Sequence, residues 1–505
     1  MERSSNRTPE AYKHLDRASA TVLIFMTLWA PWAFGSATPR TLQILCTAAY
    51  LSGALLIGKW VVRKQTGYRP SRWSEPTPAG TRLIRILAGL NIAFLLYVVI
   101  GVFNARAVGE YIPAGENQGV NLNYVERTPI VWLPASYDAP VSWNAFWRWF
   151  GFSWVFWAAR DWFLGKTRTE RRETEVDAVV FPGQRLQWWL WTLSGSSFLL
   201  AAVCVIQRLD GTDKLLWLLT PRHPDPNSIW SYPTNFHFGP YNYRGNAAEY
   251  FNLVWPLVLG LWSFSRETER RRRGVDVRVG QGPHILLLPW TLVIGAAPII
   301  SGSRGGALIT ALLTLAVGLA YSMAPSRLSL TRRLLIFGGF IALLAAAIGI
   351  GGSVILGRLR NPEPDPYSNR LVVFRESVRM MQDFKWLGSG ADTFATIQPF
   401  YKETLKETWT AYAHNDWMEA VITLGAVGTA MLVGILAIAL ILPKHQLRYG
   451  GGKTNLGMYF YLGLAGMLIH GLFDFPFQMA SLQVEFLLVL AAFTTLVQRD
   501  SGTKT

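Results

Sequence analysis

Long apolar segments recur along almost the whole chain and are separated by shorter polar stretches. Each segment is close to the roughly 20 residues that an α-helix needs to cross a bilayer. The pattern predicts an all-α integral membrane protein with about 12 transmembrane helices, built as a helical bundle in lipid. The predicted spans are residues 18–36, 41–62, 83–103, 143–163, 186–206, 246–264, 284–300, 306–323, 334–356, 416–442, 456–475 and 480–497.

The polar segments between these spans differ greatly in length. Those long enough to shape a site are residues 104–142, 207–243, 301–306 and 357–413. The last is the longest, and loops beyond roughly 12–15 residues are usually functional or disordered. Ser368 and Asn369 offer N-cap side chains there, and apolar residues follow at helical spacing. We therefore predict a large helical outer loop, with a second helix over Phe394–Lys406 after the Gly388-Ser389-Gly390 break.

Charge is distributed unevenly between the loops. The formal net charge is +16, which by itself would suggest nucleic acid, but Lys and Arg gather in alternate loops while the intervening loops are nearly balanced. That alternation follows the positive-inside rule. It predicts a multi-pass membrane protein with both termini in the cytoplasm and residues 357–413 on the outer side, and it argues against nucleic-acid binding.

The sequence motifs of several common types of catalytic and metal site are missing from this chain. The chain has only Cys46 and Cys204, each inside an apolar segment, so no disulfide framework or metal–thiolate site is expected. A phosphate-binding GxxxxGK[ST] loop, an HExxH pair and a nucleophile elbow are all missing from the sequence. Outer loops also lack an Asp-rich metal motif. We expect no metal and no cofactor.

The stretch Ser301–Gly306 places one arginine in a glycine-rich hairpin between two apolar segments. Facing lipid, Arg304 would cost about 2.5–3.5 kcal/mol on insertion scales, so it should face protein or a wet cavity. The glycines allow a tight turn and a close approach by a bulky ligand. Arg304 therefore marks a candidate anion site.

Further polar residues fall at the ends of spans on the same predicted side. Arginine forks match phosphate oxygens, and histidine is a natural general base near neutral pH. Plainer interpretations remain: a basic side chain can snorkel to the interface or be solvated, and a carboxylate can be a structural partner. The candidates beside Arg304 are Arg244, Arg370, Arg375, His414, Asn415 and Asp474, and Glu249 is a possible partner for Arg244.

Together these motifs resemble the O-antigen ligase and polymerase family of bacterial envelope enzymes. The resemblance covers about residues 241–476, which we treat as a catalytic region between an N-terminal membrane region (1–240) and a last helix with a tail (477–505). An aromatic Tyr241-Asn242-Tyr243 context departs from the family pattern. The motifs are Ser301-Gly302-Ser303-Arg304-Gly305-Gly306, Asn369-Arg370-Leu371-Val372-Val373-Phe374, Trp386-Leu387-Gly388-Ser389-Gly390, His414-Asn415-Asp416-Trp417-Met418-Glu419, Leu424-Gly425 and His470-Gly471-Leu472-Phe473-Asp474-Phe475-Pro476.

The resemblance implies a GT-C-like, metal-independent and inverting glycosyltransferase of lipopolysaccharide or other polysaccharide biosynthesis. Such an enzyme lies in the bacterial inner (plasma) membrane and passes a glycan from undecaprenyl diphosphate to an acceptor sugar at the periplasmic face, where the helical loop 357–413 would lie. Arg244, Arg304 and Arg370 would hold the diphosphate, and His414 would deprotonate the acceptor hydroxyl. Ligase, polymerase and protein-glycosylating activities remain open, as do the identity of the lipid or glycan acceptor and the oligomeric state. A multi-pass solute transporter is the alternative from another class.

Overall fold

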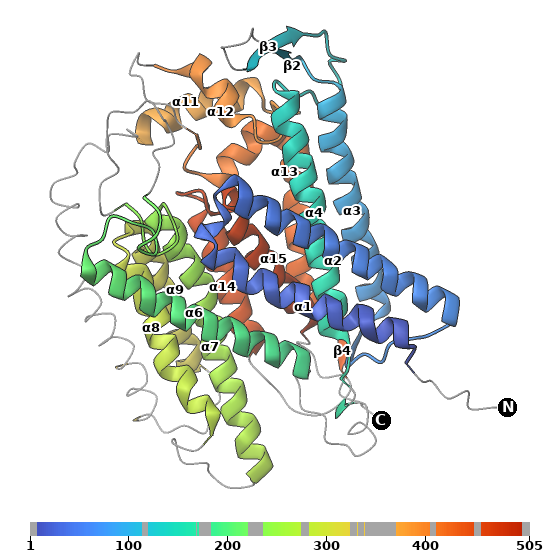
Figure 1. Cartoon of the computed structure of the whole chain (residues 1–505), viewed down its shortest axis with the longest axis vertical. Coiled ribbons are helices and arrows are strands. Elements are labelled where there is room, and N and C mark those ends of the chain that lie inside the picture. Colours follow the sequence, from blue (N-terminus) through green and yellow to red (C-terminus); the bar gives the residue numbers. More distant parts are fainter. Residues whose placement is uncertain are drawn as a thin grey trace.

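A computed structural model describes residues 8–113, 120–167, 169–170, 183–220, 236–273, 282–323, 331, 338, 370–403, 411–448 and 456–496. These residues form a bundle of helices, which confirms the predicted all-helical class of membrane protein (Figure 1). The long helices are α1 (Glu10–Trp32), α2 (Pro39–Thr66), α3 (Pro78–Phe103), α4 (Ala139–Leu164), α6 (Gln184–Asp210), α7 (Arg244–Arg273), α8 (Leu287–Ile300), α9 (Arg304–Met323), α13 (Asp416–Ile441), α14 (Leu456–His470) and α15 (Ala480–Thr495).

Every predicted span except one overlaps a described helix. The exception is 334–356, of which nearly all lies outside the described residues. Among the described helices, five are long and apolar enough to cross a membrane by length and composition: α2, α3, α6, residues Pro283–Ile300 including α8, and α13 extended to His445. Shorter apolar helices accompany them over Arg304–Ala320, α14 and α15.

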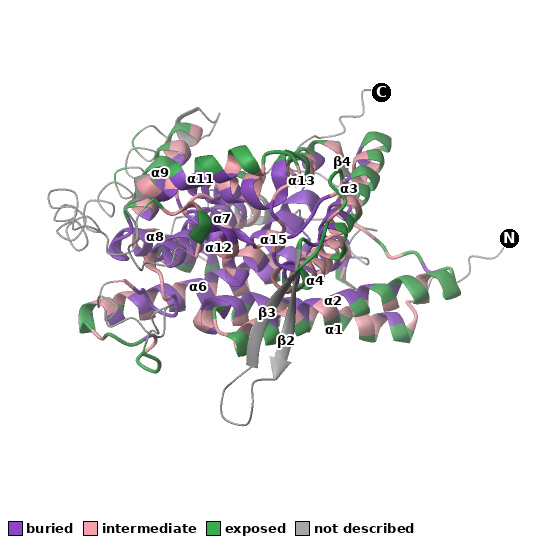
Figure 2. Ribbon diagram, turned by 90° about the horizontal axis from the view of Figure 1, so that it is seen from above, coloured by how far each residue is buried: buried purple, intermediate pink, exposed green. Residues whose placement is uncertain are grey.

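Helices α7 and α15 form the centre of the bundle. Burial is concentrated along both helices, while α1, α2 and α3 expose much of one face (Figure 2). Helix α7 packs against α14, α8 and α9, and α15 packs against α4 and α1. Large side chains fill this core, including Tyr250, Phe251 and Trp255 of α7. The amino-terminal helices α1, α4 and α6 therefore pack against α15, α7 and α8 of the region that carries the predicted motifs.

Two short antiparallel sheets were not predicted. Strand β1 (Ser74–Pro76) pairs with β4 (Gln446–Arg448), and β2 (Ala107–Pro113) pairs with β3 (Val120–Glu126). The second sheet forms a hairpin that projects from one end of the bundle (Figure 1). Alternation of apolar and polar residues in Val120–Glu126 is the strand signal that the loop prediction missed.

Residues 370–403, called here the cap, contain α11 (Arg370–Asp383), α12 (Phe394–Ile397) and a 3₁₀ turn over Gln398–Tyr401. The predicted second helix, Phe394–Lys406, was too long. Pro399 has no N–H to continue an α-helical ladder, so α12 gives way to the 3₁₀ turn. Residues 404–410 lie outside the described part.

The cap is joined to α13 through backbone hydrogen bonds. The N–H groups of Ser389 and Gly390 donate to the carbonyls of Ile422 and Thr423, both at 2.9 Å. In the other direction, Ala426 N–H donates to Lys385 at 2.8 Å. Helix α13 can offer these groups because it is kinked at Gly425, where φ is 65° and ψ is −179°. The kink thus supplies a short edge on which the cap docks.

Substitution of Gly425 by alanine should destabilise the protein. Its backbone conformation is nearly confined to glycine, and an added Cβ would lie 2.3 Å from the carbonyl oxygen of Trp386. We expect Gly425→Ala to lower the free energy of unfolding by at least about 1–3 kcal/mol. Thermal melting would measure this, with Gly89→Ala as the control because no atom lies within 4 Å of its added Cβ. An unchanged Tm for Gly425→Ala would contradict the kink's role.

Candidate functional site

The predicted hairpin lies between α8 and α9, as the sequence indicated. Gly302 turns the chain with a φ of 74°. The hydroxyl of Ser303 accepts a hydrogen bond from Gly306 N–H at 3.1 Å and so caps α9. Arg304 is the first residue of that helix and its side chain is exposed. A helix N-terminus carries partial positive charge, so Arg304 and the start of α9 together favour an anion.

Arg208 of α6 holds this hairpin from outside. Its Nη2 donates to the carbonyl of Ser301 at 2.9 Å and to the carbonyl of His237 at 3.1 Å. Its guanidinium also lies over the ring of Phe238, 5.4 Å from the centroid. Burial, together with Arg208, lowers the pKa of His237 below its ordinary value. Sequence reasoning missed Arg208 because it lies just after the predicted span 186–206, where nothing in the sequence links it to the Ser301–Gly306 hairpin.

The start of α9 packs closely against α7 and α14 and leaves no room for a side chain at Gly305 or Gly306. An added Cβ at Gly306 would lie 2.3 Å from Cβ of Ala248, and one at Gly305 would lie 2.8 Å from Nε2 of His470. The amide of Asn252 also donates to the carbonyl of Gly306 at 3.0 Å. The two glycines therefore bring the backbone next to Arg304 against the His470 ring.

His414 occupies the turn that leads into α13. It is a non-glycine residue in the left-handed region, with a φ of 52°. Its Nδ1 lies 3.5 Å from Oδ1 of Asp474, and its ring meets Phe475 edge-on at 4.9 Å. The neighbouring Asn415 accepts a hydrogen bond from Met418 N–H at 3.0 Å. Asn415 is therefore the N-cap of α13, and this cap fixes the turn that holds His414.

Asp474 joins several elements of the site. The hydroxyl of Tyr243 donates to its Oδ2 at 2.8 Å, and Nε2 of His470 lies 3.8 Å from the same oxygen. The other ring nitrogen of His470 contacts the carboxylate of Glu249, and both of these side chains are buried. Glu249 thus has His470 as a partner, which the sequence did not suggest. Polar side-chain contacts therefore run from Glu249 through His470 and Asp474 to His414.

Aromatic rings pack around these polar residues. Phe475 stacks on Tyr412 with a centroid distance of 4.7 Å and on Tyr243 at 5.1 Å. The pKa of Tyr412 is raised to about 12, first by burial and then by the negative charge of Glu419 and Asp392. Tyr412 therefore stays neutral near pH 7. The stack connects the turn before α13, the turn after α14 and the start of α7.

The remaining predicted residues lie at different distances from this centre. Arg244 begins α7, and an added Cβ on the next residue, Gly245, would lie 2.8 Å from Oδ2 of Asp474. Arg370 begins α11, but its side chain lies outside the described part. Arg375 is 65% exposed and lies 3.7 Å from Glu403, which Arg379 also contacts at 2.8 Å. The structure therefore groups His414, Asp474 and the backbone beside Arg304 and Arg244, and it places Arg375 in a surface ion pair.

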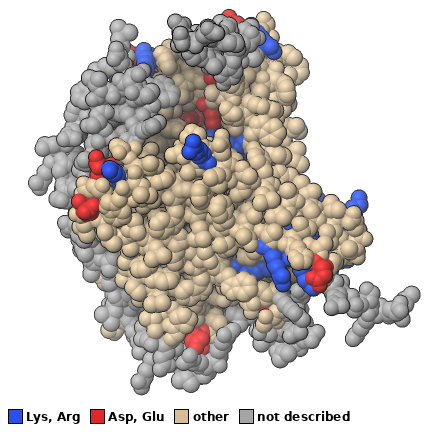
Figure 3. All heavy atoms as spheres, in the orientation of Figure 1, with Lys and Arg blue, Asp and Glu red and all other residues tan. Residues whose placement is uncertain are grey.

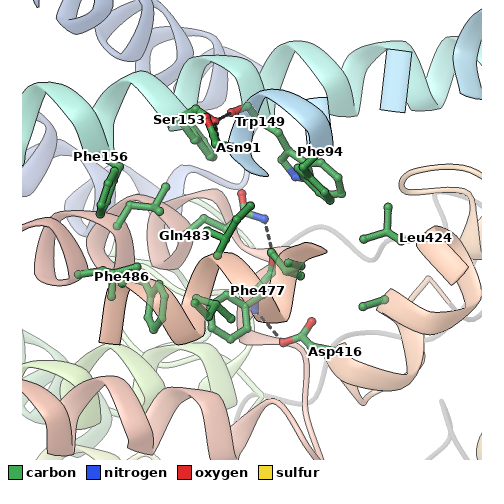
Figure 4. A pocket seen from close by; sticks show the side chains of 18 of the residues that line it. Asn91, Phe94, Trp149, Ser153, Phe156, Asp416, Leu424, Phe477, Gln483 and Phe486 are labelled. Carbon is green, nitrogen blue, oxygen red and sulfur yellow. Dashed lines mark hydrogen bonds between the residues drawn. The ribbon is translucent and has the colours of Figure 1, made fainter. Parts of the chain in front are cut away.

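An apolar cavity of about 230 Å³ lies on the other side of α13, between α3, α4, α13 and α15 (Figure 4). Its polar end contains carboxyl groups of Asp392, Asp416 and Glu419. Asp416 accepts hydrogen bonds from Phe477 N–H at 2.9 Å and from the amide of Gln478 at 3.2 Å. Asp392 forms an ion pair with Arg148. The rest of the lining is dominated by aromatic and aliphatic side chains, including Phe94, Trp149, Phe156 and Phe486.

Replacement of Tyr243 by phenylalanine should weaken the site without disturbing its packing. The change removes the hydroxyl that donates to Asp474 but keeps the ring stacked on Phe475. We expect kcat of a transfer reaction to fall about tenfold, which corresponds to roughly 1.4 kcal/mol, as for one hydrogen bond to a charged group. Tyr461→Phe on the exposed face of α14 is the matched control. Equal kcat values in the two variants would contradict the role of Tyr243.

Comparison with models of known protein families finds a match over part of the chain. Residues 290–433 match the family model described as O-Antigen ligase. This segment includes Arg304, Arg370, Arg375, His414 and Asn415 but neither Arg244 nor Asp474. No curated protein matches the chain. The chain is therefore similar to the O-antigen ligase family over residues 290–433, which include the hairpin arginine and the histidine before α13.

Proposed function

We propose that the protein transfers a glycan from undecaprenyl diphosphate to a hydroxyl of an acceptor sugar, without a metal ion, at the face of the membrane that carries the cap. The observation that carries this proposal is the meeting of an arginine-bearing helix N-terminus with a histidine–carboxylate pair. The two features meet at Gly305. The backbone of Gly305 is so close to His470 that an added Cβ would lie 2.8 Å from Nε2 of its ring, and the same nitrogen lies 3.8 Å from Asp474.

Asp474 favours the general-base role of His414. A carboxylate beside Nδ1 favours the tautomer with its proton on that nitrogen, which leaves Nε2 as the acceptor. The 3.5 Å separation is longer than a hydrogen bond, and such catalytic contacts often tighten only when substrate binds. In the proposed step the acceptor oxygen attacks the anomeric carbon, its proton passes to His414, and the bond to the diphosphate breaks. A single displacement of this kind inverts the anomeric centre.

Arg304 and the start of α9 would stabilise the leaving diphosphate. Negative charge grows on the bridging oxygen as the bond breaks, and preorganised cationic donors oppose that charge most effectively. An arginine fork remains charged at every working pH and matches two phosphate oxygens. Arg244, at the start of α7, would contribute from the neighbouring helix, and Arg370 from the start of the cap. Cations of the chain would then replace the metal that other diphosphate chemistry uses.

The apolar cavity is suited to the lipid portion of a substrate. Its lining includes residues of α13 from Asp416 to Ala439 and is dominated by aromatic and aliphatic side chains. Carboxyl groups at its polar end disfavour a diphosphate at that point. The diphosphate would therefore bind on the α7 and α9 side, and the acceptor would approach beside the carboxyl groups.

The decisive experiment uses the purified full-length protein in nanodiscs with an undecaprenyl-diphosphate-linked oligosaccharide as donor. A lipid A–core preparation and the donor glycan would be offered as separate acceptors, with EDTA and without nucleotide. Transfer to the first would define a ligase and transfer to the second a polymerase. We expect release of undecaprenyl diphosphate to depend on the acceptor and to persist in EDTA. Folded protein that releases none with either acceptor, but moves labelled solute into proteoliposomes, would instead indicate a transporter.

A further inference from the structure

A second charged cluster lies at the end of the bundle remote from His414. It is formed by the last turns of α2 and α4, the first turns of α1 and α6, and the segment before β1. Asp161 is its centre: Lys59 Nζ and Arg63 Nη2 each lie 2.9 Å from its carboxylate, and Arg72 Nη2 lies 3.4 Å away. One carboxylate therefore has to serve three cations.

The remaining carboxylates of the cluster, Asp16 and Glu170, already have partners. Asp16 lies 2.6 Å from Arg185 and 3.5 Å from Lys59. Nearby, Glu170 accepts hydrogen bonds from the backbone N–H groups of Thr167 at 2.6 Å and Gln184 at 2.7 Å. Its charge is balanced by the adjacent Lys166. Positive charge is thus in excess among the described residues of this cluster.

Arg160 adds a further cation, and Asp161, the carboxylate that attracts it, already serves Lys59, Arg63 and Arg72. Its side chain belongs to α4, next to Asp161, and the residue is only 7% exposed. Neither Nε nor Nη2 has a hydrogen-bond partner in the described part of the chain. A buried guanidinium without an acceptor is strongly unfavourable, so an anion is expected to complete the cluster. Arg72, which is near enough to Arg160 to repel its charge, is 31% exposed and offers a route from the surface.

The surface beside the cluster is apolar. On α2, Ile57, Trp60 and Val61 are exposed within one turn of Lys59 and Arg63. Figure 3 shows lysine and arginine side chains gathered beside a carboxylate near the start of α1, on a face made mostly of uncharged atoms. An exposed tryptophan next to basic residues is typical of the headgroup level of a membrane. A phosphate bound here would therefore have room for acyl chains alongside it.

We propose that Arg160 and Arg72, supported by the Asp161 cluster, bind the phosphate of an anionic membrane phospholipid. Arginine forks match phosphate oxygens in pairs, and the partly buried site would shield the interaction from salt. The site lies apart from the His414 region and does not depend on the proposed transfer reaction. A bound lipid would hold α1, α2 and α4 together at this end of the bundle.

The test is thermal melting of delipidated full-length protein in detergent. Phosphatidylglycerol, phosphatidylcholine with the same acyl chains, and inorganic phosphate would be added separately. We expect phosphatidylglycerol to raise the Tm by several degrees more than phosphatidylcholine does, and inorganic phosphate to have little effect. Arg160→Gln and Arg72→Gln should lose the extra rise but keep the response to phosphatidylcholine. Arg82→Gln, an exposed basic residue near the start of α3, is the matched control and should keep both.

Three results would overturn the proposal. Equal shifts with the two phospholipids would show that charge is not recognised. Retention of the extra rise in both Arg160→Gln and Arg72→Gln would place the lipid elsewhere. A shift with inorganic phosphate as large as that with phosphatidylglycerol would assign the site to a free anion. If Arg160→Gln does not fold, Arg72→Gln decides alone, and phosphorus analysis of lipid retained after purification gives a second measure.

Discussion

His414→Ala should reduce the rate of glycan transfer by about 100-fold to 10,000-fold, the usual contribution of a positioned general base. The imidazole lies 3.5 Å from Asp474 and is held by its left-handed backbone and by Phe475. Its loss removes the proton acceptor but no core packing. The measurement is single-turnover release of undecaprenyl diphosphate in the presence of a saturating acceptor.

Two companion variants make this expectation specific. Asp474→Asn should lower kcat in the same direction, because an amide no longer favours the Nδ1–H tautomer of His414. His14→Ala, an exposed histidine on α1, should leave transfer unchanged. Transfer by His414→Ala at more than about a tenth of the wild-type rate would remove the histidine from the role of base, because the expected loss starts near 100-fold.

Arg304→Ala should reduce transfer by about 100-fold to 1,000-fold, comparable with the loss of one preorganised donor to a developing anion. Arg304→Lys should recover only part of this loss, because an ammonium cannot make two parallel hydrogen bonds to phosphate. The effect should fall on kcat more than on KM, since the charge that Arg304 opposes grows in the transition state. Steady-state kinetics with varied donor would separate the two.

The control for Arg304 is Arg379→Ala. Arg379 is a basic residue of the cap that contacts Glu403 at 2.8 Å, and its loss should cost little because exposed ion pairs contribute about 1 kcal/mol or less. Equal losses for Arg304→Ala and Arg379→Ala would indicate a general requirement for positive charge. A complete recovery in Arg304→Lys would show that charge alone, without the fork geometry, is sufficient.

The sequence predicted local features well because they depend on neighbouring residues. The start of α13 at Asp416, the turn at Gly302 and the start of α11 at Arg370 all lie where capping residues, glycine and apolar spacing placed them. Both cysteines are free, as expected. The twelve-helix count and the GT-C-like architecture remain predictions, as do the proposed boundaries at 240 and 476, since no observation tests them.

Contacts between distant segments could not be predicted in the same way. Tyr243 and Asp474 are 231 residues apart in the chain, and His470 and Glu249 are 221 apart. Their pairing depends on how α7 and α14 pack, which periodicity within one helix does not reveal. A signal was nevertheless present: the aromatic Tyr241-Asn242-Tyr243 context that departed from the family pattern contains the tyrosine that binds Asp474.

The kink at Gly425 has a mechanical consequence for the proposed reaction. The cap is hydrogen-bonded to α13 on both sides of Gly425, and His414 immediately precedes that helix. The first turns of α13 are therefore attached both to the cap and to His414. Any swing of the cap that admits a bulky glycan must also tilt the imidazole. Substrate entry and alignment of the proposed base would then be one movement.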